Sequence, residues 1–148
     1  MIRSYEEQLS QDGFLLKETK GISMEPMLRE GREQSFIKSI PAMGREPRKG
    51  DVVLFRRSTG DFVLHRIVGR KGQVFRIRGD NCMTRELVER KDILGILAGF
   101  YRGETYVDCS TDRAYRRYVR RRRLGFPFRK GVFSLKRWRR GLLRRICK

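Results

Sequence analysis

The stretch "DVVLFRRSTGDFVLHRIVGRKGQVFRIRGDN", residues 51–81, decides the fold. Its β-branched and aromatic residues gather in three segments, 51–57, 61–70 and 73–80. A Ser-Thr-Gly spacer and a Lys-Gly spacer separate them, and spacers this short suit β-hairpins. We therefore predict three strands joined by tight turns, with a further turn at the Gly-Asp-Asn that ends the stretch.

Similar segments lie on both sides of this stretch. They are "FLLKE" at 14–18, "SFIKSI" at 35–40 and "DILGILAGFY" at 92–101, and residues 4–12 have the composition of a short helix. Several short strands at this spacing, with one minor helix, are typical of an all-β or β-rich, barrel-like domain. We predict a mainly β, barrel-like domain over residues 1–110.

The charge is distributed unevenly along the chain. The net charge is +19, yet residues 113–148 contain 16 of the 36 Lys and Arg residues and none of the 17 acidic ones. The preceding residues are nearly neutral, so the two parts need separate explanations. We assign residues 111–148 to a strongly basic, helical tail.

The tail has the pattern of a basic amphipathic helix. We predict a first helix capped by Thr111 or Asp112 and broken at "LGFPF", 124–128. In the last segment apolar residues recur at three- and four-residue steps among arginines, a pattern suited to an anionic membrane surface. The residues predicted to contact the membrane are Leu135, Trp138, Leu142, Arg139 and Arg140. Nucleic-acid phosphates are the second possible partner.

Composition argues against a membrane span and against a metal site. The longest uncharged apolar run, 93–101, has nine residues, far fewer than the roughly 20 that cross a bilayer. The first 14 residues are polar and acidic, unlike a signal peptide. We expect a cytoplasmic protein, peripheral to the inner face of the membrane. With one histidine and no CxxC pair, we expect no metal and no other cofactor.

Three polar residues supply the groups that acyl transfer needs. Ser23 lies in the turn "KGISMEPMLREG", 20–31, His65 in the strand "DFVLHRIVG", and Asp80 in the turn "RGDN". A serine needs a neighbouring base to become nucleophilic, and histidine has a pKa suited to that task. A carboxylate on the other ring nitrogen fixes the histidine tautomer. Each of these residues by itself is more often structural than catalytic. The order of the motifs that contain them supports the catalytic interpretation.

Five short motifs follow one another in the order of a known family. They are "GISMEP" (21–26), "KGDVVLF" (49–55), "LHRIVG" (64–69), "RGDN" (78–81) and "KDILGI" (91–96). Over residues 20–101 the chain resembles the type I signal peptidase superfamily, in the Ser-His branch of the endoplasmic-reticulum and archaeal enzymes. That branch has histidine where most bacterial members have lysine.

The resemblance implies a coiled β-barrel of antiparallel sheets and a serine endopeptidase that cleaves leader or signal peptides through an acyl-enzyme. It makes Ser23 the nucleophile, in a turn shaped by Met24 and Pro26, with the Ser23 N–H in the oxyanion hole. It makes His65 the general base and Asp80 the supporting carboxylate. It implies no cofactor.

The chain departs from the family pattern in three ways. Gly21 stands where many members have an oxyanion-hole serine, and Glu86 stands near the place of a further aspartate. The identity of the carboxylate that orients His65 is therefore open. We favour Asp80, because Glu86 is expected in a short connecting segment with a less ordered side chain. The third departure is the missing N-terminal anchor, which points to substrates other than those of the membrane-bound enzymes.

Two other functions are compatible with the sequence. The first is a nucleic-acid-binding protein whose barrel is a non-catalytic relative of the peptidases. The second is the self-cleaving repressor branch of the superfamily, which uses a lysine base and carries a helical DNA-binding domain before the barrel. Twenty residues precede the serine motif here, too few for that domain, and His65 does not match the lysine. We rank it third.

Overall fold

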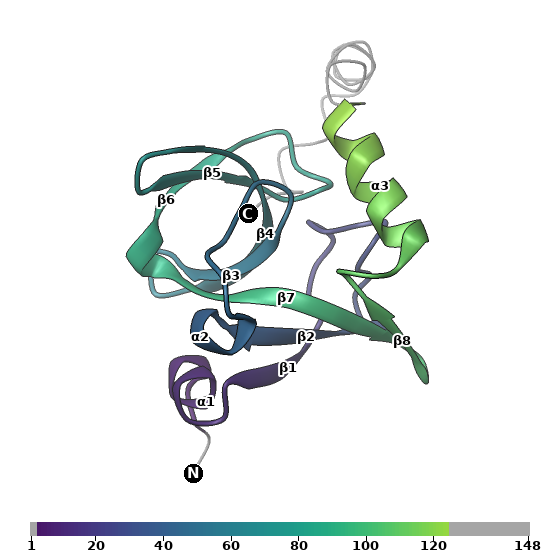
Figure 1. Ribbon diagram of the computed structural model, residues 1–148, viewed down its shortest axis with the longest axis horizontal. Coiled ribbons are helices and arrows are strands. Elements are labelled where there is room, and N and C mark those ends of the chain that lie inside the picture. Colours follow the sequence, from purple (N-terminus) through teal and green to yellow (C-terminus); the bar gives the residue numbers. More distant parts are fainter. Residues whose placement is uncertain (1–2, 125–148) are drawn as a thin grey trace.

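The computed structural model describes residues 3–124 of the chain (Figure 1). The residues predicted to contact a membrane, at 135–142, lie outside that range. The helices and strands are α1 (Tyr5–Gln11), β1 (Phe14–Glu18), β2 (Glu33–Ser39), α2 (Ile40–Met43), β3 (Val52–Arg56), β4 (Phe62–Lys71), β5 (Val74–Arg78), β6 (Glu86–Glu89), the 3-10 turn η1 (Arg90–Asp92), β7 (Ile93–Arg102), β8 (Thr105–Asp108) and α3 (Arg113–Leu124).

The strands form one antiparallel sheet in the order β1-β2-β7-β3-β4-β5-β6, with β8 paired to β7. The three strands of the 51–81 stretch are consecutive neighbours, as their short turns predict. The sheet curls into a half-barrel, with β3, β4, β5 and β6 forming its most curved part (Figure 1). The prediction of a mainly β fold is confirmed.

Two hydrophobic clusters fill the two sides of the curled sheet. One lies inside the curl and consists of Val53, Phe55, Ile67, Phe75, Ile77, Val88, Ile93 and Ile96. The other lies on the opposite side and includes Leu54, Leu97 and Phe100 from the sheet. Because successive residues of a strand point to opposite faces, the near-continuous apolar run of β3 serves both clusters.

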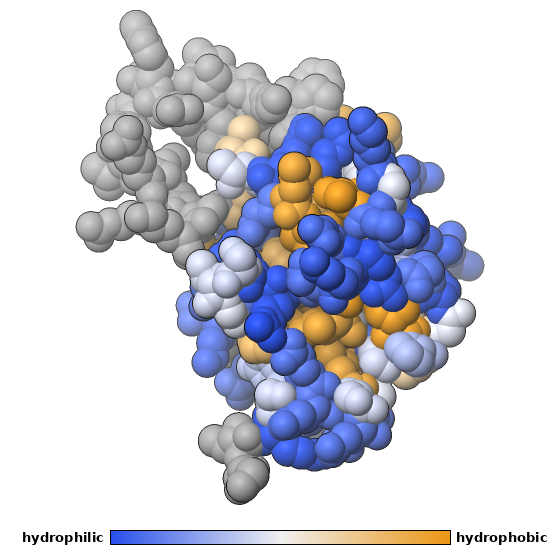
Figure 2. Space-filling model, turned by 90° about the vertical axis from the view of Figure 1, so that its left-hand side faces the viewer, coloured by the Kyte–Doolittle hydropathy of each residue, from blue (hydrophilic) through white to orange (hydrophobic). Residues whose placement is uncertain are grey.

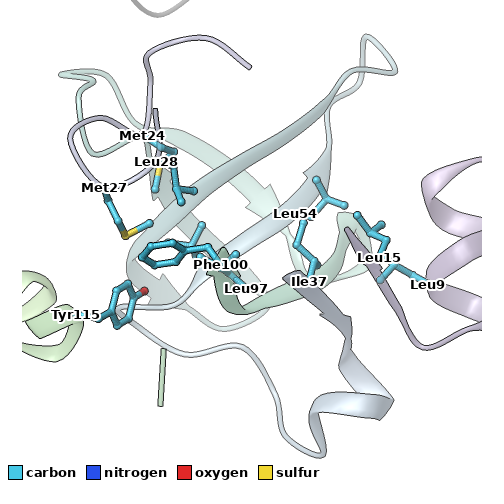
Figure 3. Close-up of a cluster of buried hydrophobic side chains, with 11 residues drawn as sticks. Leu9, Leu15, Met24, Met27, Leu28, Ile37, Leu54, Leu97, Phe100 and Tyr115 are labelled. Carbon is cyan, nitrogen blue, oxygen red and sulfur yellow. The ribbon is translucent and has the colours of Figure 1, made fainter. Parts of the chain in front are cut away.

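The loop between β1 and β2 is fixed to the sheet by its own apolar side chains. Met24, Met27 and Leu28 are buried in the second cluster, and Figure 3 shows them beside Phe100. Leu28 N–H also donates to the Met24 carbonyl, closing a turn. The loop that carries Ser23 is therefore held by burial rather than left as a free connection.

Helix α3 lies beside the sheet (Figure 1), and its residues Tyr118 and Val119 pack against the second cluster. The Asp112 carboxylate accepts the Tyr115 N–H at 2.6 Å, so of the two caps predicted from the sequence, Thr111 and Asp112, it is Asp112 that caps the helix. Tyr115 is buried in the second cluster, next to Phe100. The first helix of the basic tail thus contributes to the core of the protein.

Besides the 3-10 turn η1, three short elements were not predicted from the sequence. β6 and β8 have four residues each, and α2 is a single turn that Ser39 caps. Elements this short carry too little periodicity to be recognised, and the sheet stabilises them by pairing. None of the described helices is both long and apolar enough to cross a membrane.

We expect Leu28→Ala to lower the free energy of unfolding by about 2–5 kcal/mol, because the side chain is fully buried and its loss leaves a cavity under the Ser23 loop. Chemical denaturation measures the change. Leu87→Ala is the matched control, since Leu87 is 74% exposed and its truncation should change the value by about 0.5 kcal/mol or less. Equal effects of the two substitutions would show that the loop is not held by its core contacts.

Candidate active site

A cavity of about 360 Å³ opens between the Ser23 loop, the end of β1 and strand β4. Ser23 and His65 both line it, and so do Leu28, Leu64 and Ser35. Two of the three residues singled out from the sequence therefore meet at one hollow in the surface. The third, Asp80, is not among its lining residues.

The turn that carries Ser23 is held by the Gly-Asp-Asn turn after β5. The Asn81 N–H donates to the Ser23 carbonyl at 2.8 Å, and the Asn81 amide donates to the Ile22 carbonyl at 3.1 Å. Met24, the next residue, is buried, whereas Pro26 is exposed. Ser23 thus stands on a short segment fixed at one side by hydrogen bonds and at the other by hydrophobic packing.

Gly79 marks the point where Ser23 and His65 converge. A Cβ added to Gly79 would stand 2.6 Å from the Ser23 carbonyl oxygen and 3.1 Å from His65 Nε2. A real Cβ cannot occupy that space without moving a neighbour, so the glycine permits the close approach of the two segments. Within residues 3–124 the Ser23 hydroxyl forms no hydrogen bond, and catalytic hydrogen bonds often tighten only when substrate binds.

His65 is buried in strand β4, with 5% of its surface exposed. Its Nε2 atom faces Gly79, and its Nδ1 atom lies 3.4 Å from Glu86 Oε1. That contact falls short of hydrogen-bond geometry, so Nδ1 is buried without a hydrogen bond. Burial lowers the pKa of His65 below 6.5, and the nearby Glu86 carboxylate opposes that effect. The ring is therefore neutral at pH 7, the state in which it can accept a proton.

Glu86 is held in place by Arg57. The guanidinium of Arg57 donates to both carboxylate oxygens, Nε to Oε2 at 2.7 Å and Nη2 to Oε1 at 2.6 Å. This hydrogen-bonded pairing lowers the pKa of Glu86, which stays ionised beside the imidazole. The expectation that Glu86 lies in a poorly ordered connection is wrong, because it begins β6 and pairs with Ile77 of β5.

Asp80 does not orient His65 in this structure. Its carboxylate oxygens accept from Arg66 Nε and Arg66 Nη2, both at 2.8 Å, and the Tyr118 hydroxyl donates to it at 2.8 Å. Burial opposes ionisation here, but the Arg66 guanidinium holds the pKa of Asp80 below its usual value of 3.8. The prediction that Asp80 points at the His65 ring is therefore corrected: Glu86 holds that position.

The sequence carries one signal for the position of Glu86. In "RELVERKDI" Glu86 and Val88 stand two residues apart, so on a strand they share a face. Val88 packs inside the curl, where His65 also lies near Phe55. Arg57 carried no comparable signal, since an arginine at the end of a strand is usually solvated.

The part of the chain that the structure describes contains no group of three or more His, Cys, Asp or Glu side chains placed to hold a metal ion. The chain matches no protein-family model, and no curated protein matches it.

Asp80→Asn should destabilise the protein by about 3–5 kcal/mol, because it leaves the Arg66 guanidinium buried without its counter-charge. Thermal or urea unfolding of the purified variant measures this. The control is Asp61→Asn at an exposed position, for which we expect a change of about 0.5 kcal/mol or less. If Asp80→Asn unfolds like wild type, the ion pair does not hold the turn in the way described above.

Proposed function

We propose that the protein is a serine endopeptidase of the signal-peptidase-like class, with Ser23 as nucleophile and His65 as general base. The observation that carries this proposal is the convergence of the Ser23 turn and His65 Nε2 on Gly79, at the wall of one cavity. The curled antiparallel sheet is compatible with the coiled barrel of that family. The motif order over residues 20–101 supplies the second line of support.

In the proposed reaction the Ser23 hydroxyl attacks the carbonyl carbon of the scissile peptide bond while His65 Nε2 takes its proton. The Ser23 N–H stabilises the negative oxygen of the tetrahedral intermediate. The intermediate collapses to an acyl-enzyme, and the imidazolium returns the proton to the departing amine. Water then hydrolyses the ester with His65 again as base, which restores the Ser23 hydroxyl.

Glu86 takes the orienting role in this proposal. Its carboxylate faces Nδ1, which favours the tautomer that leaves Nε2 free to accept a proton, and it stabilises the imidazolium formed during attack. Asp80 acts through the backbone, because the turn that it anchors holds the Ser23 carbonyl. In this proposal Glu86 orients His65 and Asp80 anchors the turn that holds Ser23, whereas the sequence analysis gave the orienting role to Asp80.

The proposed substrate is an extended leader or signal-type segment. β1 is an end strand of the sheet and its last residues, Lys17 and Glu18, line the cavity. An extended peptide can pair with such an edge and bring its carbonyl to Ser23. The space beside Ser23 is bounded by Met24, Leu28 and Leu64, which suits a small residue before the cleaved bond.

The partner proposed for the tail remains an anionic membrane surface on the cytoplasmic side. Residues 113–148 have no acidic side chain to offset their positive charges, and anionic lipids attract such segments. A leader peptide presented at the membrane would then meet a peptidase held there. Nucleic acid is the competing partner.

The peptidase proposal is tested with a fluorophosphonate probe, which reacts with activated serines. We expect labelling of the wild type and a drop of about three orders of magnitude or more for Ser23→Ala and for His65→Ala, because each removes a member of one catalytic unit. Circular dichroism confirms that the variants remain folded. Ser10→Ala, on α1, is the matched serine control and should label like wild type. Equal labelling of wild type and Ser23→Ala would exclude the peptidase and favour a non-catalytic barrel.

The role of Glu86 is tested by the pH dependence of the labelling rate. Burial lowers the pKa of His65, so the acid limb of the wild-type profile should have its midpoint below pH 6.5. Glu86→Gln removes a charge that raises this pKa and leaves the Arg57 cation uncompensated. The limb should therefore move to still lower pH, and the plateau rate should fall about tenfold or more.

Glu89→Gln is the matched control for this experiment, because Glu89 lies on the same strand and its ion pair with Lys91 is exposed. Its profile should coincide with that of wild type. If the acid limb of the Glu86→Gln profile stays in place or moves to higher pH, Glu86 does not orient His65. A large rate loss in Asp80→Asn with unchanged stability and unchanged Glu86→Gln kinetics would restore Asp80 to the orienting role.

A further inference from the structure

The cavity beside Ser23 extends along strand β4. Its lining includes four consecutive residues of that strand, from Phe62 to His65. A strand advances about 3.3 Å per residue, so the Phe62 end of the cavity lies about 10 Å from His65. An extended peptide advances at the same rate. One of its side chains can therefore reach the Phe62 end about three residues from the bond that Ser23 attacks.

The amino group of Lys17 lies at the Phe62 end of this cavity. Lys17 belongs to β1 and lines the cavity, and its Nζ atom stands 5.7 Å from the centroid of the Tyr5 ring. The Tyr5 ring in turn contacts the Phe62 ring edge-on, with the two centroids 5.3 Å apart. Because an aromatic face attracts a cation, the ring holds the amino group at this place before any peptide binds.

The charge of Lys17 has no acidic partner in the protein. Among residues 3–124 no carboxylate lies within ion-pair distance of its amino group. Glu18, the one acid that lines the cavity, is the next residue of the strand, so the pleat directs its side chain to the other face. Residues 1–2 and 125–148 contain no Asp or Glu and therefore have no acidic side chain to offer.

Two effects oppose the charged form of the Lys17 amine. Burial lowers the pKa of Lys17 below 10.5, and the positive charge of Lys20 lowers it further. A carboxylate beside the amine would counter both effects, since an opposite charge favours the charged form. Of the other cations that line the cavity, Arg57 is paired with Glu86 and Lys20 is exposed. Lys17 is thus the cation that gains most from an acidic ligand.

Partial burial makes the pairing selective. Hydrophilic side chains cover most of the face of the molecule seen in Figure 2, and water screens charges at such positions. Lys17 is half-buried, so a carboxylate beside it interacts through a lower dielectric than at the open surface. An uncharged side chain of the same shape, such as asparagine, does not gain this energy.

Ser35 adds a hydroxyl beside Lys17. It is the direct partner of Lys17 on the neighbouring strand β2, so both side chains stand on one face of the sheet. Ser35 also lines the cavity, is 1% exposed, and forms no hydrogen bond through its hydroxyl within the described residues. A buried polar group without a partner costs free energy, and rotation about one torsion reorients a serine hydroxyl. The hydroxyl can thus donate to a carboxylate that Lys17 holds.

We propose that the protein selects peptides with an Asp or Glu about three residues from the cleaved bond, and that Lys17 and Ser35 bind its carboxylate. This inference rests on the proposed function, because it places the peptide along the cavity that contains Ser23. It narrows the substrate class from any extended leader segment to one with an acidic residue near its cleavage site.

The selection is tested by fluorescence anisotropy, with short dye-labelled peptides and the full-length Ser23→Ala variant, so that no peptide is cleaved. The peptides are otherwise uncharged and carry one Asp at each position in turn around a central Ala-Ala bond, and each has a matched Asn peptide. We expect one position at which Asp binds about tenfold more tightly than Asn, because a charge-assisted hydrogen bond forms there. At the other positions the ratio should be small and uniform, since the basic tail attracts any Asp equally.

Further substitutions in the same Ser23→Ala background assign the carboxylate site. Lys17→Met should abolish the preference for Asp at that position, whereas Lys17→Arg should retain most of it because the cation remains. Ser35→Ala should reduce the preference about threefold or more, since it removes one donor. Lys38→Met is the matched control, because Lys38 lies over the Phe36 ring on the opposite face of β2 from Ser35. Its ratio should equal that of the Ser23→Ala protein.

Three results would overturn the proposal: an Asp-to-Asn ratio near one at every position, an unchanged ratio in Lys17→Met, or equal losses in Lys17→Met and Lys38→Met. Fluorophosphonate labelling of the wild type decides the peptidase proposal separately, since the anisotropy measurement needs no catalysis. A labelled protein without acid selection and an unlabelled protein with it are therefore distinct outcomes.

Discussion

The buried ion pair of Arg66 and Asp80 is the interaction on which the rest of the structure depends. Its side chains are 3% and 4% exposed, and it joins parts that are distant in sequence. Arg66 also donates to the Gly50 carbonyl and the Tyr115 hydroxyl, and Asp80 accepts from Tyr118. A charged pair in the interior adds little net stability compared with apolar packing, but removing one partner is costly. The pair therefore contributes more to the relative positions of β4, the Gly-Asp-Asn turn and α3 than to the free energy of folding.

That arrangement has consequences on both faces of β4. His65 and Arg66 are adjacent in sequence, so the pleat of the strand directs them to opposite sides. His65 faces the cavity that contains Ser23, whereas Arg66 faces α3 and donates to the Tyr115 hydroxyl. The Gly-Asp-Asn turn links the two sides, since Asp80 binds Arg66 and the next residue, Asn81, holds the Ser23 carbonyl. The proposed catalytic turn and the basic helix thus share one support.

The assignment of the carboxylates shows why residue type alone is insufficient. Gly-Asp-Asn is a strong turn signal, and it correctly located a turn beside the serine loop. Two other contacts decide which carboxylate lies beside the imidazole. Asp80 pairs with Arg66 and not with His65, and the pairing of β6 with β5 brings Glu86 to His65 Nδ1. Both depend on register between strands, and a shift of one residue would send Glu86 to the other face.

The sequence by itself determined the mainly β class, the hairpins of residues 51–81, a helix cap at Thr111 or Asp112 and the division of charge, because hydrophobic periodicity, turn residues and caps act over a few neighbours. It also singled out Ser23 and His65, which line one cavity. Only the tertiary structure decided the position of Glu86 and the packing of Tyr115 and α3 on the sheet. Those features join residues tens of positions apart, and their energies depend on burial and strand register, which no local pattern of residues encodes.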